Sequence, residues 1–187
     1  MNKCERCGSN KVKVHLKMGE NYLYFCSNCY NEFMSEELDV DLEPLLETFS
    51  MKDYQGTGRT FYVERRIDPM GIFLEAVENI DLGYKFAVHG ELHSNQVELF
   101  NRLIEKTRKG IGTQQVARNV FPNGQASYSI MNDQFSGLIE YDEASEGSPL
   151  IIIDGKPFTW EEVGKMLMAY EGFQIKLKIY EFLDDIE

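Results

Sequence analysis

Four cysteines are the residues of this chain whose type and spacing most directly indicate chemistry. They are its only cysteines, and they form two C-x-x-C pairs, Cys4 with Cys7 and Cys26 with Cys29. A C-x-x-C pair places two thiolates on one tight turn, and two such pairs supply the four soft ligands of a tetrahedral zinc site. The sequence therefore predicts one structural Zn²⁺ held by these four residues.

Other uses of paired cysteines make different demands on the sequence. Disulfides need an exported chain, and Met1 is followed at once by the first pair, without an apolar signal segment. A single redox C-x-x-C would not need a second pair. Iron binds the same four thiolates and stays an open alternative to zinc. We therefore expect reduced, metal-bound cysteines in a cytoplasmic protein.

The elements around the cysteines indicate the kind of zinc module. Residues 11–17 alternate strictly between polar and apolar side chains, which is typical of a strand, and residues 22–25 return as a second strand. After Cys29 the apolar residues recur with the period of a helix as far as Leu38. A knuckle, a hairpin and a ligand pair that opens a helix predict a treble-clef or zinc-ribbon module.

These features also carry a family resemblance. Residues 4–38 resemble the small Cys4 zinc domain at the front of Clp-type unfoldase ATPases. They also resemble the front of McsA-type arginine-kinase activators, where a C-x-x-C, a strand containing Val14-His15 and a second C-x-x-C entering a helix occur in that order. The resemblance implies a module for protein–protein contact. No G-x-x-x-x-G-K-[ST] motif follows, so the resemblance does not extend to an ATPase.

Composition and charge narrow the classes of partner. A hydrophobic content of 43 % and a charged content of 27 % are typical of a globular domain, and no apolar run is long enough to span a bilayer. The net charge is −12, but residues 1–33 carry five Lys or Arg against three acids. The remainder carries fourteen against twenty-eight, a charge of −14 that repels phosphate backbones. We expect no membrane partner, and charge disfavours nucleic acid.

Proline and glycine residues, which interrupt helices and strands, divide the chain into three ranges. Pro44 ends the acidic tail of the first helix, and glycines interrupt the following stretch. We predict a Cys4 zinc module at 1–43, a connector at 44–58 and an α+β domain at 59–187. The fold class expected for the whole chain is α+β: the zinc module followed by a mainly antiparallel sheet with two main helices.

The first part of the α+β domain is rich in strand signals. Turns at 68–71 and 79–83 separate its β-rich runs, and these indicate an antiparallel meander. A helix is expected from about Ser94 to Lys109, with Val97, Phe100, Leu103, Ile104 and Thr107 on its buried side. The span 111–126 is ambiguous, with a short helix at 114–118 as one interpretation. The predicted strands cover residues 60–66, 72–78 and 83–89.

The last third combines short strands with one capped helix. Strands are expected at 128–131, 137–141 and 150–153, the last apolar throughout and central in its sheet. Thr159 and Glu162 form a capping box that opens a helix burying Trp160. Residues 173–179 alternate as a strand solvated on one side. The stretch 153–179 resembles a block in uncharacterised bacterial zinc-finger proteins, which implies a fold and no activity.

Candidate catalytic groups are sparse. Every cysteine is committed to metal, no G-x-S-x-G motif is present, and adjacent acids such as Glu161 and Glu162 are typical of a solvated face. We therefore expect a protein that is not an enzyme. His89, Glu91 and His93 would share one face if their strand continued, and could then begin a second metal site. The alternative is that these three are ordinary surface residues at a helix entry.

The leading functional hypothesis is a zinc-binding protein whose role is protein interaction or self-association, as an adaptor or regulatory module. One alternative is a nucleic-acid-binding regulator that uses the basic face of the first strand, formed by Lys11, Lys13, His15 and Lys17. Another is an enzyme with an unrecognised pocket in the α+β domain. We expect the basic face to rest against an acidic surface of its own chain or of a second copy.

Overall fold

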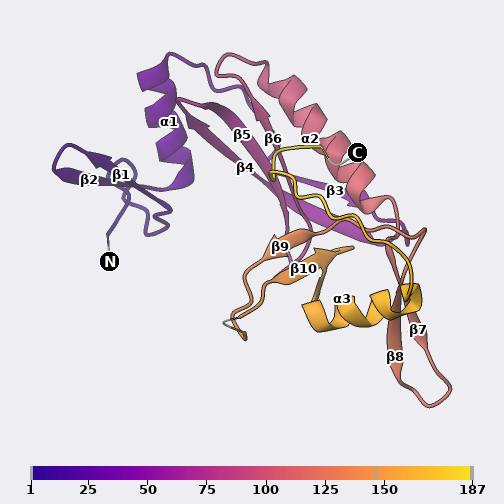
Figure 1. The fold of residues 1–187 in the computed structure, drawn as a ribbon. Coiled ribbons are helices and arrows are strands. Elements are labelled where there is room, and N and C mark those ends of the chain that lie inside the picture. The colour runs from indigo at the N-terminus through magenta and orange to yellow at the C-terminus, as the bar shows by residue number, and fades with distance from the viewer. Residues whose placement is uncertain (1, 146, 186–187) are drawn as a thin grey trace.

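A hairpin and a helix make up the N-terminal part of the chain. Strands β1 (Val14–Met18) and β2 (Asn21–Phe25) pair antiparallel, and α1 (Ser27–Leu38) follows directly (Figure 1). The helix ends where Asp39 adopts a left-handed conformation with φ of 52°. The hairpin followed by a helix agrees with the order of elements expected from the sequence. The computed structural model describes residues 2–145 and 147–185; Met1, Glu146 and residues 186–187, which fall within the predicted domain ranges, lie outside it.

The centre of the chain is a four-stranded antiparallel sheet. Its strands lie in the order β3-β4-β5-β6, so that each is joined to the next by a turn. Their bounds are Thr48–Lys52, Gly58–Asp68, Gly71–Glu78 and Lys85–Gly90. The turn between β4 and β5 requires glycine, because Gly71 has a φ of 137° and a Cβ there would lie 2.3 Å from the carbonyl oxygen of Gly90. The meander expected from the sequence is confirmed.

Strand β3 lies inside the range that the sequence predicted to be a connector. It alternates half-buried Phe49 and Met51 with exposed residues, and it pairs with β4 as the edge of the central sheet. The ring of Phe49 stacks on that of Phe61 with centroids 5.4 Å apart. This alternation spans only five residues between Pro44 and the glycines, which is too short to predict a strand from the sequence. The hydrogen bonds that stabilise β3 come from its partner strand, β4.

Helix α2 (Gln96–Ile111) packs against β5 and β6. Its N-cap is Asn95, whose side chain accepts a hydrogen bond from the N–H of Glu98, and the predicted start at Ser94 is one residue early. The helix continues through Gly110, which lies against Phe86 with no room for a Cβ. Val97, predicted to be buried, is 47 % exposed.

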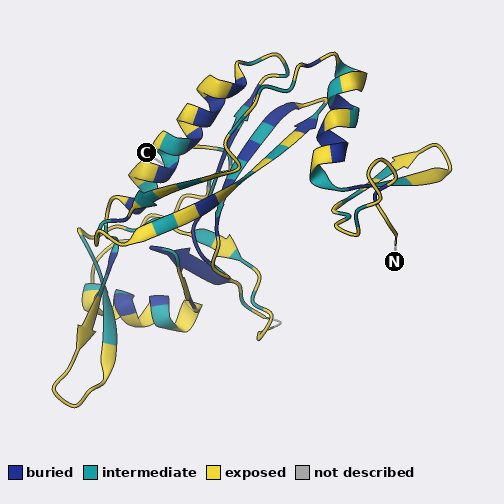
Figure 2. Cartoon of the chain, turned by 180° about the vertical axis from the view of Figure 1, so that it is seen from behind, coloured by how far each residue is buried: buried dark blue, intermediate teal, exposed yellow. Residues whose placement is uncertain are grey.

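One hydrophobic cluster joins the hairpin, α1, the central sheet and α2. It contains Phe25 and Met34 from the N-terminal part together with Ile67 and Leu74 of the sheet and Leu103 of α2. The buried residues concentrate in the sheet and on the sides of α1 and α2 that face it (Figure 2). The part of the chain that carries the cysteines therefore shares its core with the sheet.

The C-terminal part consists of a hairpin, a small sheet and a helix, and it has a second hydrophobic cluster of its own. Strands β7 (Val116–Val120) and β8 (Ala126–Ile130) form a protruding hairpin (Figure 1). A three-stranded antiparallel sheet has the order β11-β10-β9, with α3 beside β8. The remaining bounds are β9 Leu138–Glu140, β10 Leu150–Ile153, β11 Lys156–Phe158, α3 Trp160–Leu167 and a 3-10 turn Met168–Tyr170.

Several expectations for this part were confirmed and others were wrong. Strand β10 is buried throughout and central, and the capping box of Thr159 and Glu162 opens α3. The short helix suggested at 114–118 was wrong, because β7 starts there and pairs with β8. Trp160 is 43 % exposed rather than buried, because it stands at the first position of α3 and the helix buries Val163 and Met166 instead.

The strand expected at 173–179 is not formed. The segment has no regular secondary structure, and its apolar side chains are exposed. An alternating pattern specifies a strand only where a neighbouring strand completes its hydrogen bonds, and the described part of the chain provides none here. No helix among the described residues is long and apolar enough to cross a membrane.

Candidate metal centre

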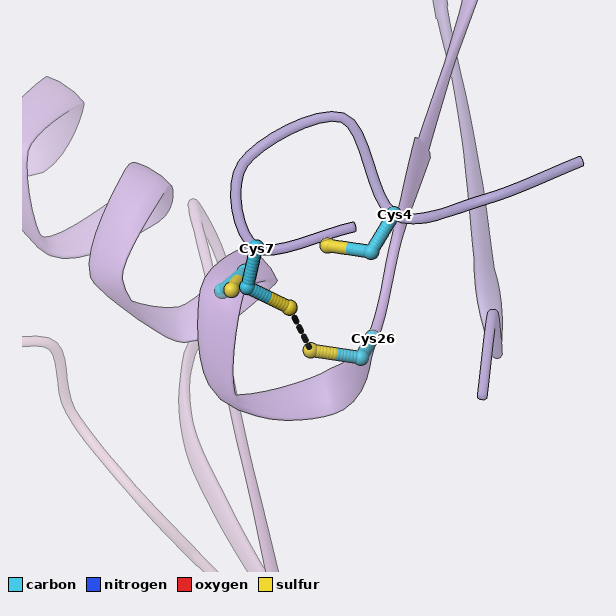
Figure 3. A group of neighbouring side chains, drawn as sticks. Cys4, Cys7 and Cys26 are labelled. Carbon is cyan, nitrogen blue, oxygen red and sulfur yellow. Dashed lines mark hydrogen bonds between the residues drawn. The ribbon is translucent and has the colours of Figure 1, made fainter. Parts of the chain in front are cut away.

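The cysteines come together because a tight turn and a helix start meet. Cys4 and Cys7 lie on a turn in which the N–H of Gly8 donates to the carbonyl of Cys4 at 2.8 Å. Cys26 is the N-cap residue of α1, and Cys29 lies in its first turn. Figure 3 shows the sulfurs of Cys7 and Cys26 pointing toward one another, with that of Cys4 beside them. The end of β2 and the first turn of α1 therefore place Cys26 and Cys29 next to Cys4 and Cys7.

The distances between the sulfurs fit a tetrahedral metal ion. The four Sγ atoms all lie within 4.8 Å of one another, and Sγ of Cys7 is 3.8 Å from Sγ of Cys26. Thiolates bound tetrahedrally at ~2.3 Å from one ion stand about 3.8 Å apart. The four residues can therefore coordinate a metal ion without rearrangement of the backbone.

The site has a buried side and an open side. Cys4 and Cys29 are 2 % and 6 % exposed, whereas Cys26 is half-buried and Cys7 is exposed. The stacked rings of Phe25 and Phe33, with centroids 5.3 Å apart, are part of the surrounding cluster. A metal ion here would be reached by solvent and by reagents from the side of Cys7.

The surroundings of the sulfurs favour a bound cation. Burial raises the pKa of Cys4, but hydrogen bonds from the backbone N–H groups of Cys26, Cys7 and Arg6 bring it down to about 6 overall. Burial, together with contacts from the other three sulfurs, raises the pKa of Cys29 well above its usual range. Four crowded sulfurs cannot all be ionised alone, so a divalent cation bound among them would supply the charge that stabilises them.

Asn31 fixes this site to the central sheet. Its side chain is 5 % exposed and contacts β4 twice. Nδ2 donates to the carbonyl oxygen of Arg65 at 2.6 Å, and Oδ1 accepts from the N–H of Ile67 at 3.0 Å. Sequence analysis missed this residue. The available signal was a short polar side chain next to Tyr30 on the apolar face of the helix.

Lys13, a residue of the predicted basic face, joins the hairpin to the central sheet through an ion pair. Nζ of Lys13 lies 2.7 Å from Oε1 of Glu64 on β4. Both side chains are about half exposed, at 58 % and 48 %. Arg6, on the first cysteine turn, also pairs with Glu32 and Glu36 of α1. These ion pairs set the hairpin and the cysteine turn against acidic residues of the same chain.

The suggested second metal site is not assembled. Within the described ranges, the four cysteines are the group of metal-ligating side chains that the structure brings together. Strand β6 ends at Gly90, so Glu91 and His93 lie in the turn before α2. The ring of His89 instead lies against Phe73, with Nε2 2.9 Å from the carbonyl oxygen of Met70.

A buried ion-pair cluster lies at the end of the central sheet where β3, β4 and β5 meet. Asp53 accepts hydrogen bonds from the N–H groups of Gln55 and Thr57 and from Arg59, each at 2.9 Å. Arg59 also pairs with Glu78 at 3.0 Å. Burial raises the pKa of Asp53, but Arg59 and the two N–H groups outweigh it and hold the pKa below its usual value. The cluster closes the β3–β4 turn.

Three family models match consecutive parts of the chain. Residues 3–41 match a domain of unknown function (DUF7685), residues 43–112 a second (DUF7686) and residues 115–184 a third (DUF7713). The second model starts within the predicted first range and includes the predicted connector. None of the models names a Clp-type or McsA-type protein, so that resemblance stays a prediction. No curated protein and no solved structure matches the chain.

Proposed function

We propose that this chain is a Zn²⁺-binding protein in which one structural zinc ion is held by Cys4, Cys7, Cys26 and Cys29 and the folded protein acts through protein interaction. The observation that carries the proposal is the fit of the four sulfurs to a tetrahedral ion. Four protein ligands fill the coordination sphere of zinc and leave no position for a substrate, which is the arrangement of structural sites. These four cysteines form no disulfide, which is compatible with a reducing compartment such as the cytoplasm.

Exposed apolar side chains on the projecting hairpins support an interaction role. Met18 and Tyr22, on the first hairpin, are 49 % and 52 % exposed. Val120 and Phe121, at the end of the β7–β8 hairpin, are 58 % and 51 % exposed. Large apolar groups grouped on projecting elements are typical of protein-binding surfaces. The role that fits these features is that of an adaptor or regulatory partner.

The two hydrophobic clusters and the three family models support a division of the chain into three consecutive units. The first unit holds the metal, the second is the central sheet with α2, and the third is the part around α3. The first two share one core, so the metal site would stabilise the sheet as well as the hairpin. The third would carry its own stability.

A binding experiment with three preparations tests the interaction role. Intact protein, protein stripped of zinc, and stripped protein to which zinc has been returned are each used to capture partners from the same extract. We expect the intact and restored preparations to capture a partner that the stripped one does not. A matched variant, Phe121→Ser, should lose the partner while it keeps its zinc if the β7–β8 hairpin is the contact.

The main competing outcome is nucleic-acid binding by the predicted basic face of Lys11, Lys13, His15 and Lys17, of which His15 and Lys17 lie on β1. Oligonucleotide binding that weakens with salt and is lost in Lys11→Glu/Lys17→Glu would contradict the protein-interaction role and favour the nucleic-acid one. Equal capture of the partner by all three preparations would show that the zinc module has no part in the interaction.

A further inference from the structure

The segment after the 3-10 turn exposes a row of large apolar side chains. Figure 1 shows its backbone as the yellow trace that runs from the end of α3 toward α2. The exposed fractions are 76 % for Phe173, 75 % for Ile175, 72 % for Leu177 and 66 % for Ile179. These four residues alternate with Gln174, Lys176 and Lys178, so that a strand conformation would gather the apolar groups on one face and the lysines on the other.

The backbone of this segment is also unpaired. Over the described residues, positions 174–180 make no backbone hydrogen bond with another part of the chain. Both ends are nevertheless held. Phe173 donates to the carbonyl of Tyr170 at 2.9 Å, and Nζ of Lys106 on α2 donates to the carbonyls of Leu183 and Asp184 at 3.1 and 2.6 Å. The segment is therefore presented between two fixed ends with its strand-forming groups free.

An edge strand elsewhere in the molecule has the complementary pattern. Strand β9 pairs with β10 on one side, and in the part of the chain that the structure describes no strand pairs with its other side. Across this sheet, Phe158 and Ile139 both lie directly opposite Ile151. Phe158 and Ile151 are 3 % and 6 % exposed, but Ile139 at the edge is 49 % exposed. The apolar row thus ends uncovered at β9.

The alternating acidic and basic residues favour β9 as the pairing site and predict the register in which the two strands pair. The stretch Ile139-Glu-Tyr-Asp142 alternates apolar with acidic residues, and Ile175-Lys-Leu-Lys-Ile179 alternates apolar with basic ones. In one antiparallel alignment Ile139 faces Ile179 and Tyr141 faces Leu177 on the apolar side. On the polar side the same alignment sets Glu140, which also pairs with Lys85 of β6, opposite Lys178. It sets Asp142, two residues after the end of β9, opposite Lys176. Opposite charges and apolar pairs in directly opposed positions are the pairs that stabilise antiparallel strands.

We propose that residues 176–180 of one copy of this chain pair antiparallel with residues 138–142 of a second copy, that is with β9 and the two residues after it, and reciprocally, to form a two-fold symmetric dimer. Within one chain the segment is anchored to α2 by Lys106 and leaves β9 unpaired, so the occupant of β9 is the segment of the partner copy. The added strand covers Ile139 and continues the row of Phe158 and Ile151. This dimer makes a second copy of the chain one partner in the protein-interaction role proposed above, through β9 rather than the β7–β8 hairpin, and in that sense rests on it.

The mass of the purified, zinc-loaded protein tests this proposal, measured by light scattering over a wide dilution range. We expect a dimer for the unaltered protein and a monomer for Leu177→Pro, because proline removes an N–H donor and is excluded from a paired strand. Lys176→Glu should weaken the dimer by roughly tenfold, because two symmetry-related pairs become repulsive at once. Adding Asp142→Lys should restore it, because the pair is rebuilt with its signs exchanged.

Arg102→Glu provides the matched control. It makes the same change of charge on the exposed side of α2, away from β9, and should leave the dimer unchanged. A monomer at every concentration, a dimer that survives Leu177→Pro, or a failure of Asp142→Lys to rescue Lys176→Glu would overturn the proposal. So would a monomer whose amides at 174–180 are protected from hydrogen exchange, since the strand would then pair within its own chain. Zinc content, measured on each sample, shows independently whether the metal-binding proposal stands.

Discussion

The side-chain amide of Asn31 on α1 donates a hydrogen bond to the carbonyl oxygen of Arg65 on β4, at 2.6 Å. The same amide accepts a hydrogen bond from the N–H of Ile67. One buried residue, two positions beyond the last cysteine, therefore joins the helix that carries Cys29 to the central sheet through the backbone of the sheet.

Asn31→Ala should destabilise the protein by about 3 kcal/mol, because it leaves a buried N–H and a buried carbonyl of β4 without partners. Asn28→Ala changes an exposed asparagine of the same helix and should have little effect. Denaturant unfolding of both variants, followed by circular dichroism, measures the difference. Equal stability of the two variants would show that the Asn31 contacts do not support the junction.

Removal of the metal should destabilise the central sheet as well as the hairpin. Because Tyr30 and Met34 of α1 share a core with Ile67 and Ile72 of the sheet, a chelator should unfold residues 3–41 and also speed amide exchange in β4. The C-terminal cluster around Val163 should keep its protection and provides an internal reference. Hydrogen exchange with mass detection measures each part separately. Protection of β4 that survives chelation would contradict the shared core.

Asp53→Asn should lower stability at neutral pH by about 3 kcal/mol, because it leaves Arg59 buried beside one carboxylate instead of two. The folded state lowers the pKa of Asp53 below its unfolded value of about 3.9. The contribution of its charge is therefore complete above about pH 4 and is lost as the pH falls through the lower folded value. The stability difference between the two proteins should shrink in acid. Unfolding curves between neutral and acidic pH check this, with exposed Glu37→Gln as the control.

The ion pair between Lys13 and Glu64 should make a small contribution, because both side chains are about half exposed. Lys13→Glu should cost at most about 0.5 kcal/mol, and the exchange Lys13→Glu/Glu64→Lys should recover it. The loss should shrink in high salt. Small-angle scattering should show little change of shape, since Asn31 and the shared core still hold the hairpin in place. A large loss of stability, or a detached hairpin, would mean that this pair carries the junction.

Local signals were sufficient for the elements that depend on neighbours in sequence. The capping box at Thr159, the apolar strand β10 and each C-x-x-C pair rest on residues within a few positions of one another, and the sequence predicted each of them. Strand β3 depends on β4, whose paired residues lie six to fourteen positions away. Asn31 contacts Arg65 and Ile67, which lie 34 and 36 positions away. Periodicity within one segment does not contain that information.

The segment 173–179 is a second case in which periodicity within one segment did not predict the structure. Its alternation is as regular as that of any strand in the chain, yet it is exposed and unpaired. An alternating sequence indicates which face of a strand would be apolar. Whether that face is buried depends on a partner strand elsewhere in the structure. Trp160 is a related case, because its place at the start of α3 turns a large apolar side chain toward solvent.

The central claim is that the four cysteines hold one zinc ion, and the metal content of the purified protein tests it most directly. Elemental analysis should find one zinc and no iron per chain in the unaltered protein and in Ser27→Ala, which alters the same helix turn without removing a ligand. Cys29→Ser should contain no tightly bound zinc, because it removes a buried ligand. Iron in place of zinc, or a protein free of metal whose four thiols all react in the folded state, would contradict the account.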